Sequence, residues 1–130
     1  MASTFERIEK LALGLPEAQR VDIEAWGGEP TFRVRGKNFV FANPAGTVIT
    51  VKLSKEEAEA VVATVEGAHP TGYGLGRHGW ISVDLPTRLT RERREEVEEW
   101  ILTSYTLVAP KTLARQLLAG PDAEPGGRGR

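Results

Sequence analysis

Residues 31–53 read TFRVRGKNFVFANPAGTVITVKL. Apolar and polar side chains alternate along most of this stretch, which is the period-two pattern of strands that bury one face. Two turn signals interrupt the alternation: Gly36-Lys37 and the triplet Pro44-Ala45-Gly46. The pattern therefore predicts three consecutive antiparallel strands joined by two short hairpin loops.

The first loop sets which side chains pair across the first hairpin. If Gly36-Lys37 is a two-residue loop, Val34 faces Phe39 and Phe32 faces Phe41. Both pairs are then apolar and lie on the same side of the sheet, as a buried face requires. The phenylalanines of this hairpin are therefore predicted to belong to the core.

The second loop needs an odd number of residues to continue that buried face. A three-residue loop, Pro44-Ala45-Gly46, places Phe41 opposite Ile49 and Phe39 opposite Val51. The glycine of the triplet supplies the left-handed residue that such a loop needs. A four-residue loop would instead turn polar side chains of the third strand into the core, so we predict the odd loop.

Helices flank this three-stranded segment. Three are predicted to begin after Ser3, Ser54 and Thr90, because each of these residues is a favoured N-cap and is followed by apolar residues at helical spacing. The second of them is predicted to end at Gly67, and a short fourth helix is predicted after Pro110.

Two more alternating runs predict further strands. In the first, Val21 and Ile23 are predicted to point inward and Arg20 and Asp22 outward. The second covers residues 80–85, and if its apolar residues face inward, Trp80 faces outward. The element order indicates an α+β fold in which an antiparallel sheet carries helices packed on one side. We predict a single domain over residues 1–118 and a disordered tail over residues 119–130, which are rich in Gly, Pro and charge.

Composition excludes several classes of protein. The chain has 130 residues, too few for a (β/α)₈ barrel or a kinase. Without cysteine it has no disulfide, thiolate nucleophile or cysteine zinc site, which fits a reducing compartment, and we expect a cytoplasmic protein. No apolar run reaches the roughly 18 residues of a membrane span, so we expect no membrane partner.

One glycine-rich loop matches a known motif by its letters alone. Residues 74–79, GLGRHG, fit G-x-G-x-x-G, but a strand pattern follows where a dinucleotide site needs a helix. The dinucleotide interpretation is rejected. Two interpretations stay open: a plain surface loop, or an anion-binding loop formed by Gly74, Gly76, Arg77 and His78.

No catalytic or metal-binding constellation is recognisable. His69 and His78 are the only histidines, neither has a carboxylate at helical spacing, and paired glutamates lie on predicted solvated helix faces. No serine lies in a nucleophile-elbow pattern. We therefore expect no cofactor, no metal and no enzymatic activity; an enzyme, the third interpretation, would need a deep polar pocket lined by His78 and a carboxylate.

Charge is segregated along the chain although the net charge is only −1. Residues 31–53 contain four basic and no acidic residues, whereas residues 1–30 contain six acidic and three basic ones. By the predicted register, Arg33, Arg35 and Lys52 share the face opposite the phenylalanines, with Lys37 at the hairpin tip. One face of the sheet is therefore predicted to be positive.

A positive sheet face with an accessible aromatic side chain suits nucleic acid. Lys and Arg contact phosphates, and a base stacks on indole. The predicted interface consists of Arg33, Arg35, Lys37, Lys52, Arg77 and Trp80. The four cations of residues 31–53 release few counterions, so binding is expected to be weak and strongly salt-sensitive.

Two other interpretations remain open. Strands also direct charges outward merely for solubility and edge protection. A protein-interaction domain or a small-anion-binding domain, using the loop of residues 72–79 and the exposed rim, is the alternative function. In each case we expect a monomer.

Four segments resemble the MmcQ/YjbR family: residues 15–18 (LPEA), 26–37 (WGGEPTFRVRGK), 79–83 (GWISV) and 104–111 (SYTLVAPK). The resemblance extends nearly to Leu118, and the 26–37 string is the most specific part. It implies a compact α+β domain of the double-wing, CyaY-like type, in a family commonly labelled as predicted DNA-binding. It supplies no catalytic residues. The family's recurrent residues in this chain are Trp26, Gly27, Pro30, Phe32, Gly36, Lys37 and Phe39.

Overall fold

The computed structural model describes residues 3–24, 28–72 and 74–118; the predicted tail at 119–130 lies outside these residues. One antiparallel sheet runs in the order β1-β2-β3-β4-β6-β5. Its strands are β1 (Ala18–Ile23), β2 (Glu29–Val34), β3 (Lys37–Ala42), β4 (Val48–Lys52), β5 (Ala68–Pro70) and β6 (Trp80–Asp84). The helices are α1 (Thr4–Leu13), α2 (Lys55–Thr64), the 3₁₀ turn η2 (Leu75–His78), α3 (Arg91–Val108) and α4 (Lys111–Leu118). The predicted α+β class is confirmed.

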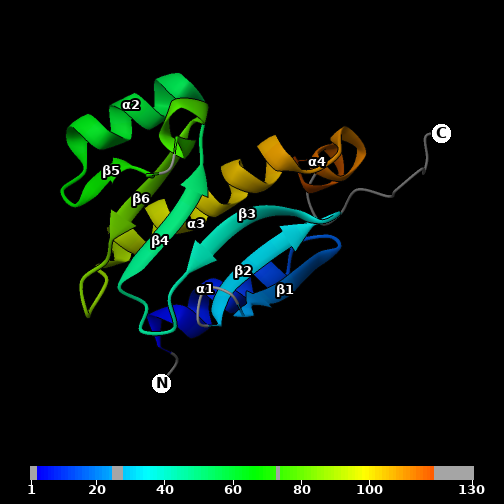
Figure 1. Ribbon diagram of the computed structural model, residues 1–130, viewed down its shortest axis with the longest axis horizontal. Helices are drawn as coiled ribbons and strands as arrows, with labels where there is room; N and C mark the ends of the chain where they lie inside the picture. Colours follow the sequence, from blue (N-terminus) through cyan, green and yellow to red (C-terminus); the bar gives the residue numbers. More distant parts are fainter. Residues whose placement is uncertain (1–2, 25–27, 73, 119–130) are drawn as a thin grey trace.

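Helices cover one face of this sheet. Figure 1 shows α1 and α3 behind the strands, α2 beside β5 and β6, and α4 following α3. Alternate strand residues enter one core with α1 and α3; among the most deeply buried are Phe32, Val51, Ile81 and Ile101. We call the opposite side of the sheet the open face. No helix within the described residues is long and apolar enough to cross a membrane.

The predicted helix starts are confirmed. The hydroxyls of Ser3, Ser54 and Thr90 each accept a hydrogen bond from the backbone N–H three residues on. Helix α2 ends earlier than predicted, because Val65 adopts an extended backbone and residues 68–70 form β5. Strand β5 was not predicted, because three residues are too few to show an alternation.

The predicted register of the first hairpin is wrong. Arg35 and Gly36, at φ 52° and 81°, form the turn, so Lys37 faces Val34. The register then shifts at Phe32/Arg33, and Phe32 faces Val40. This irregularity lets two successive residues of β3, Phe39 and Val40, both be buried. A strict two-residue alternation predicts that only one of two successive strand residues is buried.

The predicted register of the second hairpin is also wrong. Phe41 lies opposite Thr50, and Ala42 opposite Ile49, so the loop is even rather than odd. The Asn43 side chain closes it, because its Oδ1 accepts hydrogen bonds from the backbone N–H groups of Thr47 and Val48. Phe41 consequently lies on the open face and not in the core.

Strand β1 presents the opposite side from the predicted one. Val21 pairs with Thr31 on the open face and is 37% exposed. Arg20 lies on the helix side, with its guanidinium over the Phe5 ring and a 2.7 Å ion pair to Glu9 of α1. At this edge of the sheet the cation–π contact and the ion pair outweigh the burial of a valine.

Strands β3 and β4 part at one end, and Ser104 of α3 bridges them. Their pairing stops at Val40 and Val51. Beyond it the Ser104 Oγ accepts a hydrogen bond from the Lys52 N–H at 2.9 Å and donates one to the Phe39 carbonyl at 2.6 Å. Ser104 is fully buried. The Ser104 hydroxyl thus bonds to the two backbone groups that would pair with each other if the strands did not part.

Replacement of this hydroxyl is expected to destabilise the fold. Ser104→Ala leaves one backbone donor and one backbone acceptor buried without partners, at roughly 1–3 kcal/mol each. We expect urea denaturation to show a loss of roughly 2–6 kcal/mol in the free energy of unfolding. Thr64→Ala, which removes an exposed hydroxyl bonded to the Ala60 carbonyl, is the control and should change stability little. Equal stability of the two variants would contradict the bridging role.

Tyr105, beside Ser104, is completely buried. Its ring packs edge-on against the Phe39 ring, with 5.3 Å between the ring centroids. Its hydroxyl donates a hydrogen bond of 2.7 Å to the Pro16 carbonyl oxygen. Burial raises the pKa of the phenol above its ordinary value, because the phenolate is poorly solvated there, and the carboxylate of Glu17 raises it further. The tyrosine therefore favours folding only while it is protonated.

This pKa difference predicts alkaline sensitivity. The unfolded tyrosine ionises near pH 10 and the folded one at higher pH, so the stability present below about pH 10 is lost as pH rises above it. Urea titrations between about pH 9 and 11 should show a steeper loss for the wild type than for Tyr105→Phe. Parallel losses in the two proteins would show that Tyr105 does not carry the effect.

Candidate nucleic-acid interface

The open face is graded in charge from one end to the other. Near the end where β3 and β4 part, Gln19 pairs with Arg33, Arg33 pairs with Asn38, and Lys52 pairs with Trp80. Further along lies a chain of hydroxyls, in which Ser82 is 2.9 Å from Thr50 and 3.0 Å from Thr71. The far end carries acidic Glu29 and Asp84. The cations of the face therefore gather at the parted strands.

A hollow opens where the two strands part. It has a volume of about 410 Å³ and is lined by residues of the first hairpin tip, of β4 and β6, and of the end of α3: Gly36, Lys37, Asn38, Lys52, Trp80, Leu107 and Val108. Leu107 is 47% exposed, and the Asn38 Oδ1 is buried without a hydrogen-bond partner. We call this space the strand-gap hollow. It combines an aromatic wall, apolar surface, one amide and two ammonium groups.

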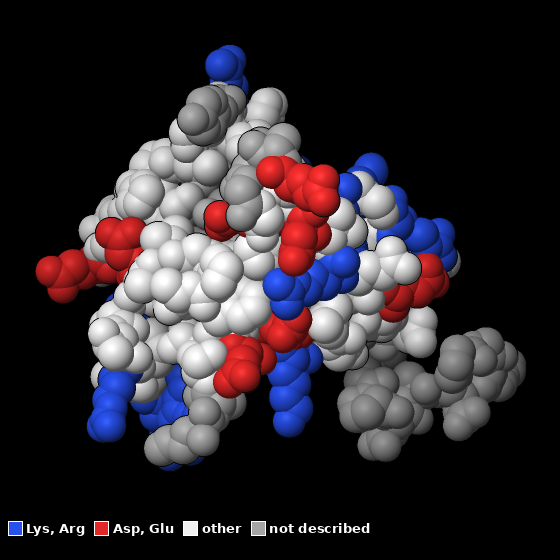
Figure 2. Space-filling view, turned by 60° about the horizontal axis from the view of Figure 1, so that its bottom comes forward, with Lys and Arg blue, Asp and Glu red and all other residues white. Residues whose placement is uncertain are grey.

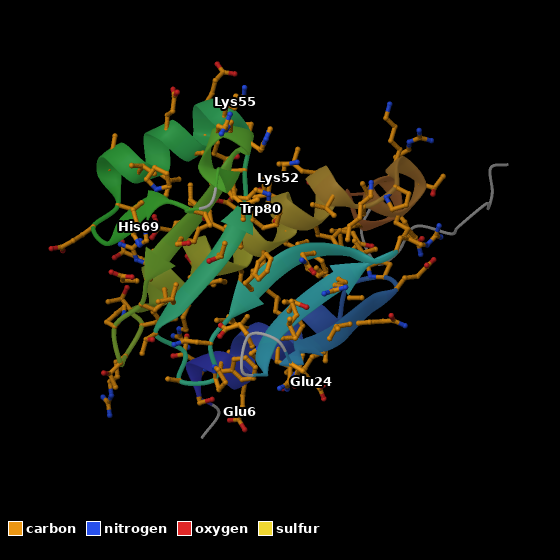
Figure 3. All side chains as sticks on the ribbon, viewed as in Figure 1. Glu6, Glu24, Lys52, Lys55, His69 and Trp80 are labelled. Atoms are coloured by element: carbon orange, nitrogen blue, oxygen red, sulfur yellow. The ribbon has the colours of Figure 1, made fainter. Side chains whose placement is uncertain are left out.

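Trp80 separates this hollow from a second basic surface. Its ring contacts Phe41 edge-on at 5.6 Å across β4. On its other side a depression of about 280 Å³ is lined by Lys55, Arg77 and Glu59, among others. Figure 3 shows Lys52, Lys55 and Trp80 close together at the upper end of the sheet. The predicted outward position of Trp80 therefore gives it cations on both sides.

Most of the predicted interface residues lie at this end of the molecule, but Arg35 does not share the face. It lies in the turn, where its guanidinium forms a two-pronged ion pair with Glu17 at 2.5 and 3.0 Å. Each partner strengthens the charge of the other: the hydrogen bond to Arg35 lowers the pKa of Glu17, and the hydrogen bond to Glu17 raises that of Arg35. The prediction that Arg35 shares this face is wrong, because Arg35 lies in the turn and not on the strand.

The other predicted cations keep their charge available. Among the described residues, no carboxylate lies within ion-pair distance of Arg33, Lys37, Lys52 or Arg77. The Nε of Arg33 donates only to the Thr31 hydroxyl, at 3.2 Å. Elsewhere the charges are mixed; Figure 2 shows red and blue side chains interspersed over the centre of its view. The strand-gap end is thus positive without a globally positive surface.

The glycine-rich loop uses its amides internally. The N–H groups of Leu75, Gly76 and Gly79 donate to the carbonyls of Gly72, Thr71 and Gly76. Gly74 has a left-handed backbone, and a four-residue 3₁₀ turn follows it before β6 begins. Of the predicted anion-binding residues, Gly76 therefore has its N–H occupied within the loop, whereas the side chains of Arg77 and His78 are exposed.

Three residues that line these two depressions were not predicted from the sequence: Asn38, Lys55 and Leu107. Asn38 and Leu107 reach the strand-gap hollow only because the strands part over α3. Lys55 directly follows the N-cap Ser54, and an exposed lysine at the start of a helix is no sign of a binding site. No local pattern marks any of the three.

Comparisons with known proteins agree with the fold. A family model described as YjbR matches residues 13–107. The crystal structure of Deinococcus radiodurans protein DR2400, which contains the DUF419 family domain, superposes with a TM-score of 0.67. That pair is 22% identical and the match covers 98% of this chain and 96% of the other, so it supports the fold alone. No curated protein matches this chain.

The position of Trp80 depends on the glycine before it. Gly79 is at φ 93° and its carbonyl accepts from the Leu53 N–H at 2.9 Å; an added Cβ would collide with the Leu53 carbonyl oxygen. Gly79→Ala is expected to cost roughly 2–4 kcal/mol, from the left-handed backbone and the collision. Gly72→Ala, where an added Cβ meets nothing within 4 Å, is the matched control. Thermal unfolding measures both, and similar transitions would contradict this tight approach.

Proposed function

We propose that this chain, which belongs to the YjbR family, is a non-enzymatic module that binds single-stranded nucleic acid at the strand-gap end of its open face. The observation that carries the proposal is the placement of Trp80 between two pairs of cations. Lys37 and Lys52 lie on one side of the ring, and Lys55 and Arg77 on the other. A stacked base flanked by phosphates needs this alternation of aromatic and cationic groups.

The size and chemistry of the strand-gap hollow suit one nucleotide. Its volume of about 410 Å³ falls within the range of small-molecule sites. Trp80 and Leu107 offer apolar surface to a base, and the unpartnered Asn38 amide oxygen can accept a hydrogen bond from a base amino group. Lys37 and Lys52, which line the hollow, would contact the adjoining phosphates. A double helix, whose bases are already stacked, cannot use the hollow in this way.

The electrostatics predict weak binding. Three or four phosphate contacts on a single strand give a salt dependence of roughly −2 to −3 in log K against log[salt]. Because the net charge is −1, there is no long-range attraction to add to these contacts. Affinity should therefore be measurable at low ionic strength and should fall steeply in physiological salt.

Fluorescence anisotropy of a labelled eight-residue oligothymidylate, titrated at low and at moderate salt, tests the proposal. The double variant Lys37→Ala/Lys52→Ala should weaken binding about tenfold or more and reduce the salt slope by about 1.4. Trp80→Leu should weaken binding by roughly 1–3 kcal/mol with an unchanged slope.

The control carries the same change of charge elsewhere. Lys10→Ala/Arg91→Ala removes two cations from α1 and α3, and should bind the oligomer as the wild type does. The proposal would be refuted if the wild type did not bind the oligomer. It would also be refuted if the two double variants bound it with equal affinity. An RNA oligomer and a duplex of the same length complete the series; a duplex bound more tightly than the single strand would also refute it.

A further inference from the structure

A second site, unrelated to the open face, lies between α1 and α3 on the helix side. It consists of two adjoining depressions, of about 640 and 430 Å³. They share Thr4, Arg7, Leu89 and Arg94, and so form one continuous groove. One end of the groove is mainly apolar and the other is polar.

Three arginines converge on the polar end. Arg7 comes from the first turns of α1, Arg88 from the connection before α3, and Arg94 from the first turn of α3. Among the described residues none of the three has a carboxylate within ion-pair distance. The lining of this end includes no acidic side chain in the described part of the chain. Three positive charges therefore face the polar end without an ion-pair partner among the described residues.

Arg94 is the most telling of these side chains. Its Nε is buried and has no hydrogen-bond partner within the described structure. A buried guanidinium N–H without an acceptor is energetically unfavourable. An anion in the groove would supply that acceptor. The Arg94 side chain also reaches the apolar end, so it stands where the two halves of the groove meet.

The apolar end is formed by facing stripes of the two helices. Leu11 of α1 and Val97 of α3 line it, together with Leu89 from the connection before α3. Two carboxylates also border it. Glu6 is held in the α1 cap, where its Oε1 accepts from the Ser3 N–H at 2.8 Å, and Glu98 lies on the exposed side of α3.

We propose that this groove binds a small amphipathic carboxylate, with its head on Arg7, Arg88 and Arg94 and its aliphatic chain between α1 and α3. Guanidinium groups pair bidentately with carboxylate, and the amino-terminal end of α1, whose Thr4 lines both depressions, adds favourable dipole potential. The apolar stripe favours a bound aliphatic chain because it removes the methylenes of the chain from water. The combination selects against both a simple anion and a neutral lipid.

Decanoate is the probe, titrated below its micelle concentration and monitored by isothermal calorimetry and by two-dimensional NMR of the methyl groups. We expect saturable binding of one decanoate per chain, with shifts centred on Leu11, Leu89 and Val97. Decanol and decyltrimethylammonium, which share the chain but lack the negative head, and acetate, which lacks the chain, should each bind at least tenfold more weakly. Equal binding of decanol would overturn the proposal.

Paired variants separate this site from the open face. Arg88→Gln/Arg94→Gln should weaken decanoate binding at least tenfold, whereas Arg91→Gln/Arg115→Gln, with the same loss of charge, should not change it. Unfolding transitions of all variants verify that the fold is kept. Arg94→Lys keeps the positive charge but loses the two-pronged geometry of the guanidinium group. It should bind decanoate more weakly than the wild type and more tightly than Arg88→Gln/Arg94→Gln.

The Lys37→Ala/Lys52→Ala protein should bind decanoate as the wild type does. Loss of decanoate binding in that protein, or full binding in Arg88→Gln/Arg94→Gln, would place the ligand elsewhere and refute the inference. Failure of the nucleic-acid proposal leaves these outcomes unaffected, because the two sites share no residue.

Discussion

The parting of β3 and β4 over Ser104 is the constraint on which the rest of the molecule depends. A continuous sheet would pair Phe39 with Lys52 and leave no space between the strands. Here the α3 hydroxyl takes both backbone bonds, so the strands diverge without burying an unsatisfied group. The bulge in β3 serves the same geometry, since it turns Phe39 toward Tyr105 and the helix. The strand-gap hollow is the outer side of this arrangement.

The two faces of the sheet differ in whether their basic side chains form ion pairs. On the helix side, Arg20 is neutralised by Glu9 and Asp22, and at the turn Arg35 is neutralised by Glu17. On the open face the cations near the gap have no such partners among the described residues, while acidic groups collect at the opposite end. A chain of nearly zero net charge can therefore present a local positive surface, because burial and pairing decide which charges a ligand meets.

The candidate sites differ in how far the sequence could reveal them. Lys52 and Trp80 were placed on one face correctly, because alternation in β4 and β6 is regular and each strand has its own apolar residues as a reference. Arg35, Phe41 and Val21 were misplaced. A left-handed turn, a bulge, an even loop and an edge strand each shift or reverse the parity by one residue, and a one-residue shift exchanges the two faces. The groove of Arg7, Arg88 and Arg94 joins three segments that have no periodic relation in sequence.

Local chemistry determined the helix starts, the number of long strands and the α+β class, since caps, turns and apolar spacing act within a few residues. The family resemblance follows from the same local strings and is supported by the match over residues 13–107. Only the tertiary structure decided the hairpin registers, the side that β1 presents, the strand-gap hollow and the partners of each arginine. These depend on contacts between residues far apart in the chain, such as Ser104 with Lys52 and Phe39, where packing over α3 overrides the local two-residue period.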